Sequence, residues 1–216
     1  MLKTVIFDLD GTIGDTLPLC VLAFKKAIEP LGGVELTPRE IISHFGPSEE
    51  GVIRELFPER YEEATELFIQ SYRDLHDMAP APFEGIVPLL EQLKERGIRN
   101  TVVTGKGMRT LRITLERYGI AALFDRLEAG SPEGPCKAAK IRKILAELEV
   151  RPEEALYVGD APTDITESHE AGVEVCSAAW ASTAEPELLE RMNPGRVFRT
   201  VPELAAFLDK KTARSE

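Results

Sequence analysis

Carboxylates stand at the ends of two β-favouring runs in this chain, where parallel strands would present them to a ligand. Asp8 and Asp10 follow the apolar run Thr-Val-Ile-Phe, and Asp160 and Asp164 follow the run 155–158. Ligand sites of parallel α/β sheets lie beyond the carboxyl ends of the strands, so we expect these side chains to gather around one crevice. Their motifs offer only oxygen ligands, which suit a hard divalent cation better than zinc.

Two further segments supply groups suited to an anion. A third run ends at Thr104-Gly105, and Lys137 begins a helix-like segment, with Lys106 and Lys140 as alternative cations. A single Asp after a strand is most often a turn or capping residue, and a threonine there can be a buried hydroxyl. Capping does not explain two adjacent carboxylates together with a distant Gly-Asp-x-x-x-Asp. We therefore favour a catalytic site.

The elements that must hold these groups alternate between strand and helix. Apolar residues on consecutive positions predict strands buried on both faces, over 4–7, 98–104, 155–158, 173–177 and 196–198. Apolar residues at spacings of three and four predict helices over 86–96, 138–148 and 201–208. This alternation predicts an α/β fold with a doubly wound parallel sheet.

One stretch interrupts the alternation. Residues 16–78 contain helical periodicity but no convincing strand, and the proline-rich connector 79–82 follows them. Within the stretch, Thr37-Pro38-Arg39-Glu40 is typical of a capping box with proline at the first helical position. A length of about 65 residues is close to that of a small domain. We therefore expect an inserted helical domain of residues 16–80 and an α/β core of residues 1–15 and 81–216.

Charge and composition limit the partners. The 216 residues include 26 Lys and Arg against 37 Asp and Glu, a net charge of −11, which disfavours nucleic acid and anionic membranes. An anionic substrate must therefore be held by local cations or a metal. We expect neither a membrane span nor a signal peptide, because no apolar run is long enough and Asp8 and Asp10 interrupt the first one. Three cysteines without ligand spacing favour a reducing cytoplasm. The oligomeric state has no signal in the sequence.

The order of these motifs resembles that of a known family. Asp-x-Asp-Gly-Thr begins at Asp8, Thr-Gly at Thr104 and Gly-Asp-x-x-x-Asp at Gly159, with Lys137 between the last two. This series is similar to the haloacid dehalogenase superfamily of phosphatases, over residues 4–208. The helical insertion resembles the α-helical cap of phosphoglycolate phosphatase-like members. The resemblance implies a Rossmann-like core with a cap domain.

The resemblance also implies a role for each motif residue. Asp8 is expected to be the nucleophile that forms an aspartyl-phosphate, and Asp10 the general acid and base. The expected phosphate-binding residues are Gly11, Thr104, Gly105 and Lys137. The expected cofactor is Mg²⁺, which usually takes a few carboxylates together with water and phosphate. Its ligands would be Asp8, the Asp10 carbonyl and Asp160, with Asp164 as a ligand or a supporting residue.

The chain is thus expected to be an enzyme, a hydrolase acting on phosphoric monoesters. We expect a magnesium-dependent phosphatase for a small phosphorylated metabolite, similar to phosphoglycolate phosphatases. A β-phosphoglucomutase-like phosphomutase, a pyrophosphatase and a nucleotidase remain alternatives, because substrate choice depends on cap side chains. The alternative from another class is a non-enzymatic phosphoacceptor or binding module. A receiver-like domain of that class is normally shorter and lacks a helical insertion.

A turn in the insertion is the expected specificity element. A helix over 41–45 is stopped by Gly-Pro, and the polar turn there would point from the cap into the site. We expect His44, Phe45 and Ser48 to help choose the substrate, and the turn resembles the specificity loop of phosphoglycolate phosphatase-like caps. The alternative is that Phe45 packs inside the cap and the turn only joins helices. Gly14 stands beside an Asp-Thr pair where the family often has an aliphatic residue, and we interpret it as added freedom between core and cap.

Overall fold

The computed structural model describes residues 1–31 and 36–213, and in these residues the strands form one six-stranded sheet. The strands are β1 (Thr4–Phe7), β2 (Arg99–Val103), β3 (Arg126–Glu128), β4 (Ala155–Gly159), β5 (Glu174–Ala178) and β6 (Val197–Phe198). Their spatial order is β3-β2-β1-β4-β5-β6, and every neighbouring pair is parallel. The predicted parallel α/β fold is confirmed.

Strand β1 lies inside the sheet, which explains its unbroken apolar run. Phe7 pairs with Val102 of β2 on one side and Val158 of β4 on the other. All four β1 residues are fully buried, as expected for a strand covered on both faces. The five predicted strands lie within one residue of their expected bounds. Strand β3 was not predicted, because it has only three residues and begins with the exposed Arg126.

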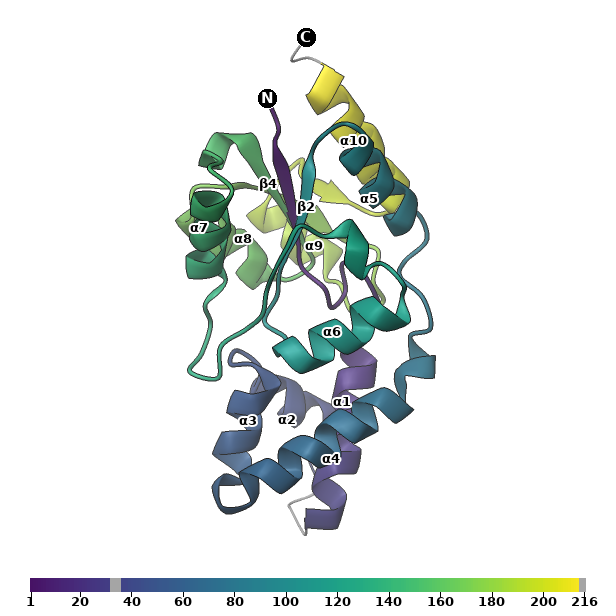
Figure 1. The fold of residues 1–216 in the computed structure, drawn as a ribbon, viewed down its shortest axis with the longest axis vertical. Coiled ribbons are helices and arrows are strands. Elements are labelled where there is room, and N and C mark those ends of the chain that lie inside the picture. Colours follow the sequence, from purple (N-terminus) through teal and green to yellow (C-terminus); the bar gives the residue numbers. More distant parts are fainter. Residues whose placement is uncertain (32–35, 214–216) are drawn as a thin grey trace.

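Helices cover both faces of the sheet. One face carries α5 (Ile86–Glu95), α6 (Met108–Arg117) and α10 (Val201–Ala213), and the other carries α7 (Lys137–Glu147), α8 (Pro162–Glu170) and α9 (Pro186–Met192). Figure 1 shows α5 and α10 on one side of the strands and α7 and α8 on the other. Alternate residues of β1 serve the two faces, since Phe7 packs with the first group and Ile6 with the second.

A second group of helices lies beyond the carboxyl ends of the strands, at the lower end of Figure 1. Its members are α1 (Leu17–Ile28), α2 (Pro38–Ser43), α3 (Glu49–Leu56) and α4 (Tyr61–Asp74). They bury an apolar cluster of their own, in which the rings of Phe24 and Phe68 have centroids 4.4 Å apart. Ile113 of α6 joins this cluster, so α6 joins the inserted helices to the sheet. Thr37 and Glu40 form the predicted capping box at the start of α2.

Short connections complete the described chain. Single 3-10 turns lie at Glu29–Leu31, Pro58–Arg60, His76–Met78, Ala121–Leu123 and Pro152–Glu154. No helix within residues 1–31 or 36–213 is long and apolar enough to cross a membrane.

Glycine stands at position 14 because of limited space, and not because it gives added freedom between core and cap, as the sequence was interpreted. Its φ is not in the positive region, so it does not use the conformational freedom of glycine. A Cβ at Gly14 would instead lie 2.4 Å from the Tyr118 hydroxyl, at the C-terminal end of α6. Glycine is therefore required at this position to leave room for the Tyr118 ring.

Candidate active site

The end of β1 places Asp8 and Asp10 where the chain leaves the sheet. Asp8 is 5% exposed, and Asp10 lies partly open to solvent. Gly11 follows with φ of +75°, a left-handed conformation that favours glycine. A Cβ at Gly11 would also lie 2.0 Å from Asp160 Oδ2. Glycine therefore lets the loops that follow β1 and β4 touch.

Three carboxylates meet at this edge of the sheet. Asp8, Asp160 and Asp164 each offer an oxygen atom, and these atoms lie within 4.8 Å of one another. Burial raises the pKa of Asp8 to about 7, against the lowering effect of Lys137. Burial, and then the neighbouring Asp8, also raise the pKa of Asp160 well above its ordinary value. A cation would relieve this repulsion, and the all-oxygen donor set fits a hard divalent ion.

Lys137 is the cation nearest to this cluster. It begins α7, and its Nζ lies 3.2 Å from Asp8 Oδ1 and 2.5 Å from Asp164 Oδ1. Burial acts to lower the pKa of Lys137, but the Asp164 and Asp8 carboxylates outweigh it and hold that pKa well above its ordinary value. Lys137 therefore stays charged beside Asp8.

Asp164 is fully buried and fixed by its neighbours. Its Oδ1 accepts a hydrogen bond from the Tyr157 hydroxyl at 3.0 Å, in addition to the Lys137 contact. Its Oδ2 accepts from the Ala161 N–H at 2.9 Å, at the start of α8. Three of its roughly four acceptor sites are thus used, and Asp164 sets the position of Lys137.

The loop after β2 brings a hydroxyl and backbone to the same place. Thr104 is buried, and its Oγ1 accepts a hydrogen bond from the Lys106 N–H at 3.2 Å. Gly105 is packed against Gly130. A Cβ added to Gly130 would lie 2.0 Å from the Gly105 carbonyl oxygen. The Gly130 N–H donates to the Lys106 carbonyl at 2.8 Å. Close packing of two loops fixes the Thr104-Gly105 backbone beside the carboxylates.

Lys106 has a role that sequence reasoning missed. We considered it as a rival to Lys137 or a solvated residue, but its side chain is only 1% exposed. Its Nζ lies 3.2 Å from Asp10 Oδ1 and 3.2 Å from Oε1 of Glu49, and 4.7 Å from the centre of the Tyr72 ring. Burial acts to lower the pKa of Lys106, and the surrounding acidic groups, Asp10 first, hold it well above its ordinary value. The only sequence signal was a lysine directly after a strand-end Thr-Gly.

The Asp10 side chain contacts Lys106 and Thr16, whereas Lys137 contacts Asp8 and Asp164. Besides Lys106, its Oδ1 accepts a hydrogen bond from the Thr16 hydroxyl at 2.5 Å. Thr16 immediately precedes α1, the first inserted helix. The Asp10 side chain is therefore held by one residue of the β2–α6 loop and one at the entrance to the insertion.

A cavity of about 260 Å³ connects these groups with the inserted helices. Its sheet side includes the predicted Asp8, Asp10, Thr104, Gly105, Lys137 and Asp160. Its opposite side is lined by Leu17, Cys20, Phe45, Gly46, Pro47 and Glu49. Six predicted site residues from separate loops thus share one cavity, as the strand-end rule led us to expect.

The predicted specificity turn is only partly in this cavity. Phe45 lines it, but His44 and Ser48 are not among the described residues that do. His44 Nδ1 lies 3.5 Å from Glu55 Oε1, within the insertion. Ser48 is 1% exposed, and its N–H donates to the Ser131 carbonyl at 2.8 Å. The turn therefore reaches the cavity through the predicted Phe45 together with Gly46 and Pro47, and contacts a core loop through Ser48.

Sheet order and site geometry together define a class of protein. The parallel sheet is Rossmann-like, with carboxylates at its carboxyl edge and helices α1 to α4 between β1 and the rest of the sheet. Residues 5–178 match the haloacid dehalogenase-like hydrolase family, and the chain belongs to that family. The resemblance seen in its motifs is confirmed, and the chain is a hydrolase.

Individual relatives cover nearly the whole chain. It is 28% identical over 212 residues to a pyrophosphatase PpaX of Halalkalibacterium halodurans, covering 97% of this chain and 98% of the relative. It is 29% identical over 182 residues to a phosphoglycolate phosphatase of Aquifex aeolicus, covering 83% and 85%. Among solved structures, a haloacid dehalogenase-like hydrolase of Streptococcus pneumoniae superposes with a TM-score of 0.76 at 26% identity, covering 96% and 98%.

Proposed function

We propose that this chain is a magnesium-dependent phosphatase that hydrolyses a small phosphate monoester through an aspartyl-phosphate. The observation that carries the proposal is the buried Asp8 carboxylate beside Lys137 in a cluster of three aspartates. Two relatives support a hydrolysis reaction at a phosphate group. One is a phosphoglycolate phosphatase and the other is a pyrophosphatase.

Asp8 acts as the nucleophile in this proposal. One of its oxygens attacks phosphorus while the bond from phosphorus to the ester oxygen breaks. Lys137, held by Asp164, favours the ionised form of Asp8 against the effect of burial and offers positive charge to the phosphoryl oxygens. Thr104 and the Gly105 N–H, which line the cavity, complete the phosphate-binding groups together with Gly11, which packs against Asp160.

Asp10 moves the proton in both halves of the reaction. It protonates the ester oxygen as the alcohol leaves, and it then accepts a proton from the water that attacks the aspartyl-phosphate. Hydrolysis releases inorganic phosphate and restores the Asp8 carboxylate. The contacts to Lys106 and Thr16 keep Asp10 separate from the three-carboxylate cluster, which suits a residue with a different task.

Mg²⁺ is the proposed cofactor, held by Asp8, the Asp10 carbonyl and Asp160. When bound, it would supply positive charge that offsets the charge of Asp8 and of the phosphoryl group. Asp164 is assigned to support rather than direct ligation, because Lys137, Tyr157 and the Ala161 N–H already occupy its oxygens.

The surroundings of the site support further proposals. Separate apolar clusters support a catalytic core of residues 1–15 and 81–216 and a cap of residues 16–80. The cavity between them favours an enzyme over a phosphoacceptor module. The three unpaired cysteines support a reducing cytoplasm. Pyrophosphate hydrolysis is the second candidate activity, because a relative 28% identical over 212 residues is a pyrophosphatase.

The experiment that tests the proposal is phosphate release from p-nitrophenyl phosphate with and without Mg²⁺. Wild-type protein should turn over only with the metal, and Asp8→Asn should abolish turnover. The matched control is Asp74→Asn, which changes an exposed aspartate of α4 in the same way and should leave the rate unchanged. Near-normal turnover by Asp8→Asn, with deamidation excluded, contradicts the nucleophile assignment.

A further inference from the structure

Glu49 is a carboxylate from the insertion that is bound inside the core. It is the first residue of α3 and is 6% exposed. Its Oε2 accepts from the Gly107 N–H, and its Oε1 accepts from the Thr110 hydroxyl at 2.8 Å. Oε1 also lies 3.2 Å from Lys106 Nζ. Three groups of the β2–α6 loop and α6 thus fix the position of this negative charge.

The Glu49 carboxylate offsets the positive charge of Lys106. Asp10 and Glu49 approach the Lys106 ammonium at the same distance of 3.2 Å. When Asp10 carries the proton for the leaving group, the Glu49 charge alone balances the ammonium, and when Asp10 is ionised the three groups carry one net negative charge. Lys106 therefore has no positive charge to spare for an anion in the cavity.

The remaining lining on the side of the insertion is apolar. Besides Glu49 it consists of Leu17, Cys20, Phe45, Gly46 and Pro47. Among the described residues that line the cavity, the cations are Lys106 and Lys137, and the latter is committed to Asp8 and Asp164. A carboxylate or phosphate on the leaving group would meet Glu49 with no unshared cation beside it, and like charges in contact are strongly unfavourable.

We propose that Glu49 is a specificity-determining residue, which makes the leaving-group side of the cavity accept small uncharged groups and reject anionic ones. The inference rests on the proposed phosphatase function and narrows its substrate class. A volume of about 260 Å³ favours a small leaving group, since sites for drug-sized ligands usually exceed roughly 300 Å³. Phosphoglycolate and pyrophosphate, which carry extra negative charge, are then poor substrates.

The test uses two substrates of equal carbon number, glycerol 3-phosphate and 3-phosphoglycerate, which end in a hydroxymethyl group and a carboxylate. We expect wild-type kcat/KM to favour glycerol 3-phosphate by roughly tenfold or more, because the carboxylate lies near the Glu49 charge. Glu49→Gln removes the charge and keeps one acceptor oxygen for the Gly107 N–H, while the Thr110 hydroxyl can still donate to the Gly107 carbonyl. It should reduce that preference by roughly tenfold.

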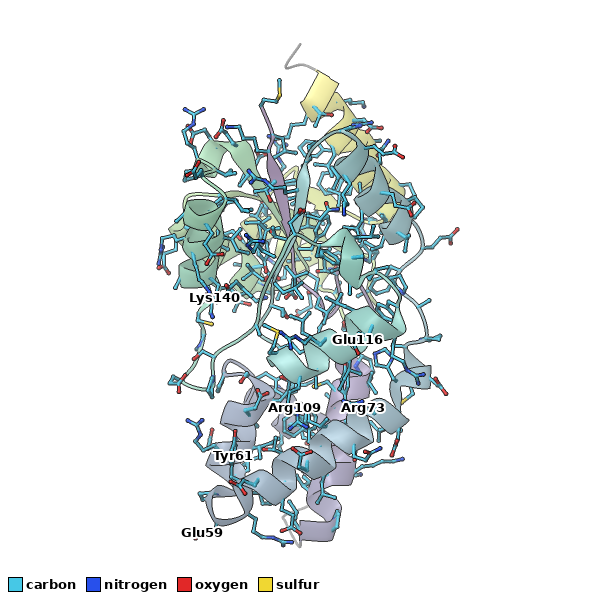
Figure 2. The ribbon with its side chains drawn as sticks, in the orientation of Figure 1. Glu59, Tyr61, Arg73, Arg109, Glu116 and Lys140 are labelled. Atoms are coloured by element: carbon cyan, nitrogen blue, oxygen red, sulfur yellow. The ribbon has the colours of Figure 1, made fainter. Side chains whose placement is uncertain are left out.

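Glu66→Gln is the matched control. Glu66 also joins the insertion to α6, through Arg109 at 2.6 and 3.0 Å, but on the exposed surface. Figure 2 shows Arg109 between α6 and α4. Neither Arg109 nor Glu66 is among the described residues that line the cavity. This variant should keep the wild-type preference, because an exposed ion pair contributes little and carries no charge into the site.

Each outcome decides the proposal. A wild-type protein that treats both esters equally, prefers 3-phosphoglycerate, or hydrolyses neither while turning over p-nitrophenyl phosphate overturns it. Equal losses on both esters in Glu49→Gln, with an unchanged ratio, also overturn it, because they show a purely structural role. Absence of any magnesium-dependent turnover, p-nitrophenyl phosphate included, would instead contradict the phosphatase function itself.

Discussion

Asp8→Asn should make the metal-free protein more stable while removing its activity. Burial raises the pKa of Asp8 from 3.8 to about 7, so its ionised form is unfavourable in the folded state. Each pKa unit corresponds to about 1.4 kcal/mol, so ionised Asp8 lowers the free energy of unfolding by about 4 kcal/mol at pH 8. Asparagine has a similar shape and no charge, and Lys137 keeps Asp164 as its partner.

The pH dependence follows from the direction of this change. A carboxyl whose pKa is raised in the folded state binds its proton more tightly there, so stability falls as the pH rises from about 4 through about 7. The stability gained by Asp8→Asn should therefore be about 4 kcal/mol at pH 8 and less than half as large at pH 5.

Urea unfolding in EDTA at the two pH values measures this gain. The control Asp74→Asn should not change the free energy of unfolding at either pH, because Asp74 is exposed. Addition of Mg²⁺ should stabilise the wild type more than Asp8→Asn, since a bound cation offsets the charge. An Asp8→Asn protein that is less stable than the wild type at pH 8 in EDTA would refute the reasoning.

Three further outcomes are expected. Asp10→Asn should reduce kcat by about 100- to 10,000-fold with the fold retained, as measured by steady-state kinetics and circular dichroism. Gly11→Ala should displace the Asp160 side chain, because the new Cβ would lie 2.0 Å from Asp160 Oδ2. The Mg²⁺ concentration that gives half the maximal rate should therefore rise, and an unchanged concentration would contradict this. Phe45→Ala should raise KM for the best substrate more than His44→Ala does, because only Phe45 of the two lines the cavity; equal effects contradict this.

The fold and most of the site could be predicted because local sequence determines them. The unbroken apolar run of β1 predicts a strand that is buried on both faces. Because the carboxyl ends of parallel strands meet at one edge of the sheet, the sequence also predicts that Asp8, Thr104 and Asp160 lie close together. The Thr37 capping box depends on neighbours in sequence and was also predictable.

Contacts between distant segments could not be predicted in the same way. Glu49 looked like an ordinary acidic residue at a helix start, and only the packing of α3 against the β2–α6 loop brings it to Lys106. The requirement for Gly14 likewise depends on the place of the Tyr118 ring. The turn's local pattern also does not say which of its side chains face the cavity: of His44, Phe45 and Ser48, Phe45 is the one found among the described lining residues.

The most direct test of the account is to trap the covalent intermediate on Asp8. Asp10→Asn protein, which should form the aspartyl-phosphate slowly and hydrolyse it more slowly still, is mixed with p-nitrophenyl phosphate and Mg²⁺, quenched, and treated with borohydride. Borohydride reduces an acyl phosphate to the alcohol, so mass spectrometry of the N-terminal peptide should find homoserine at position 8. Homoserine at another aspartate, or turnover with no reduced residue at any time point, would contradict the assignment of Asp8 as the nucleophile.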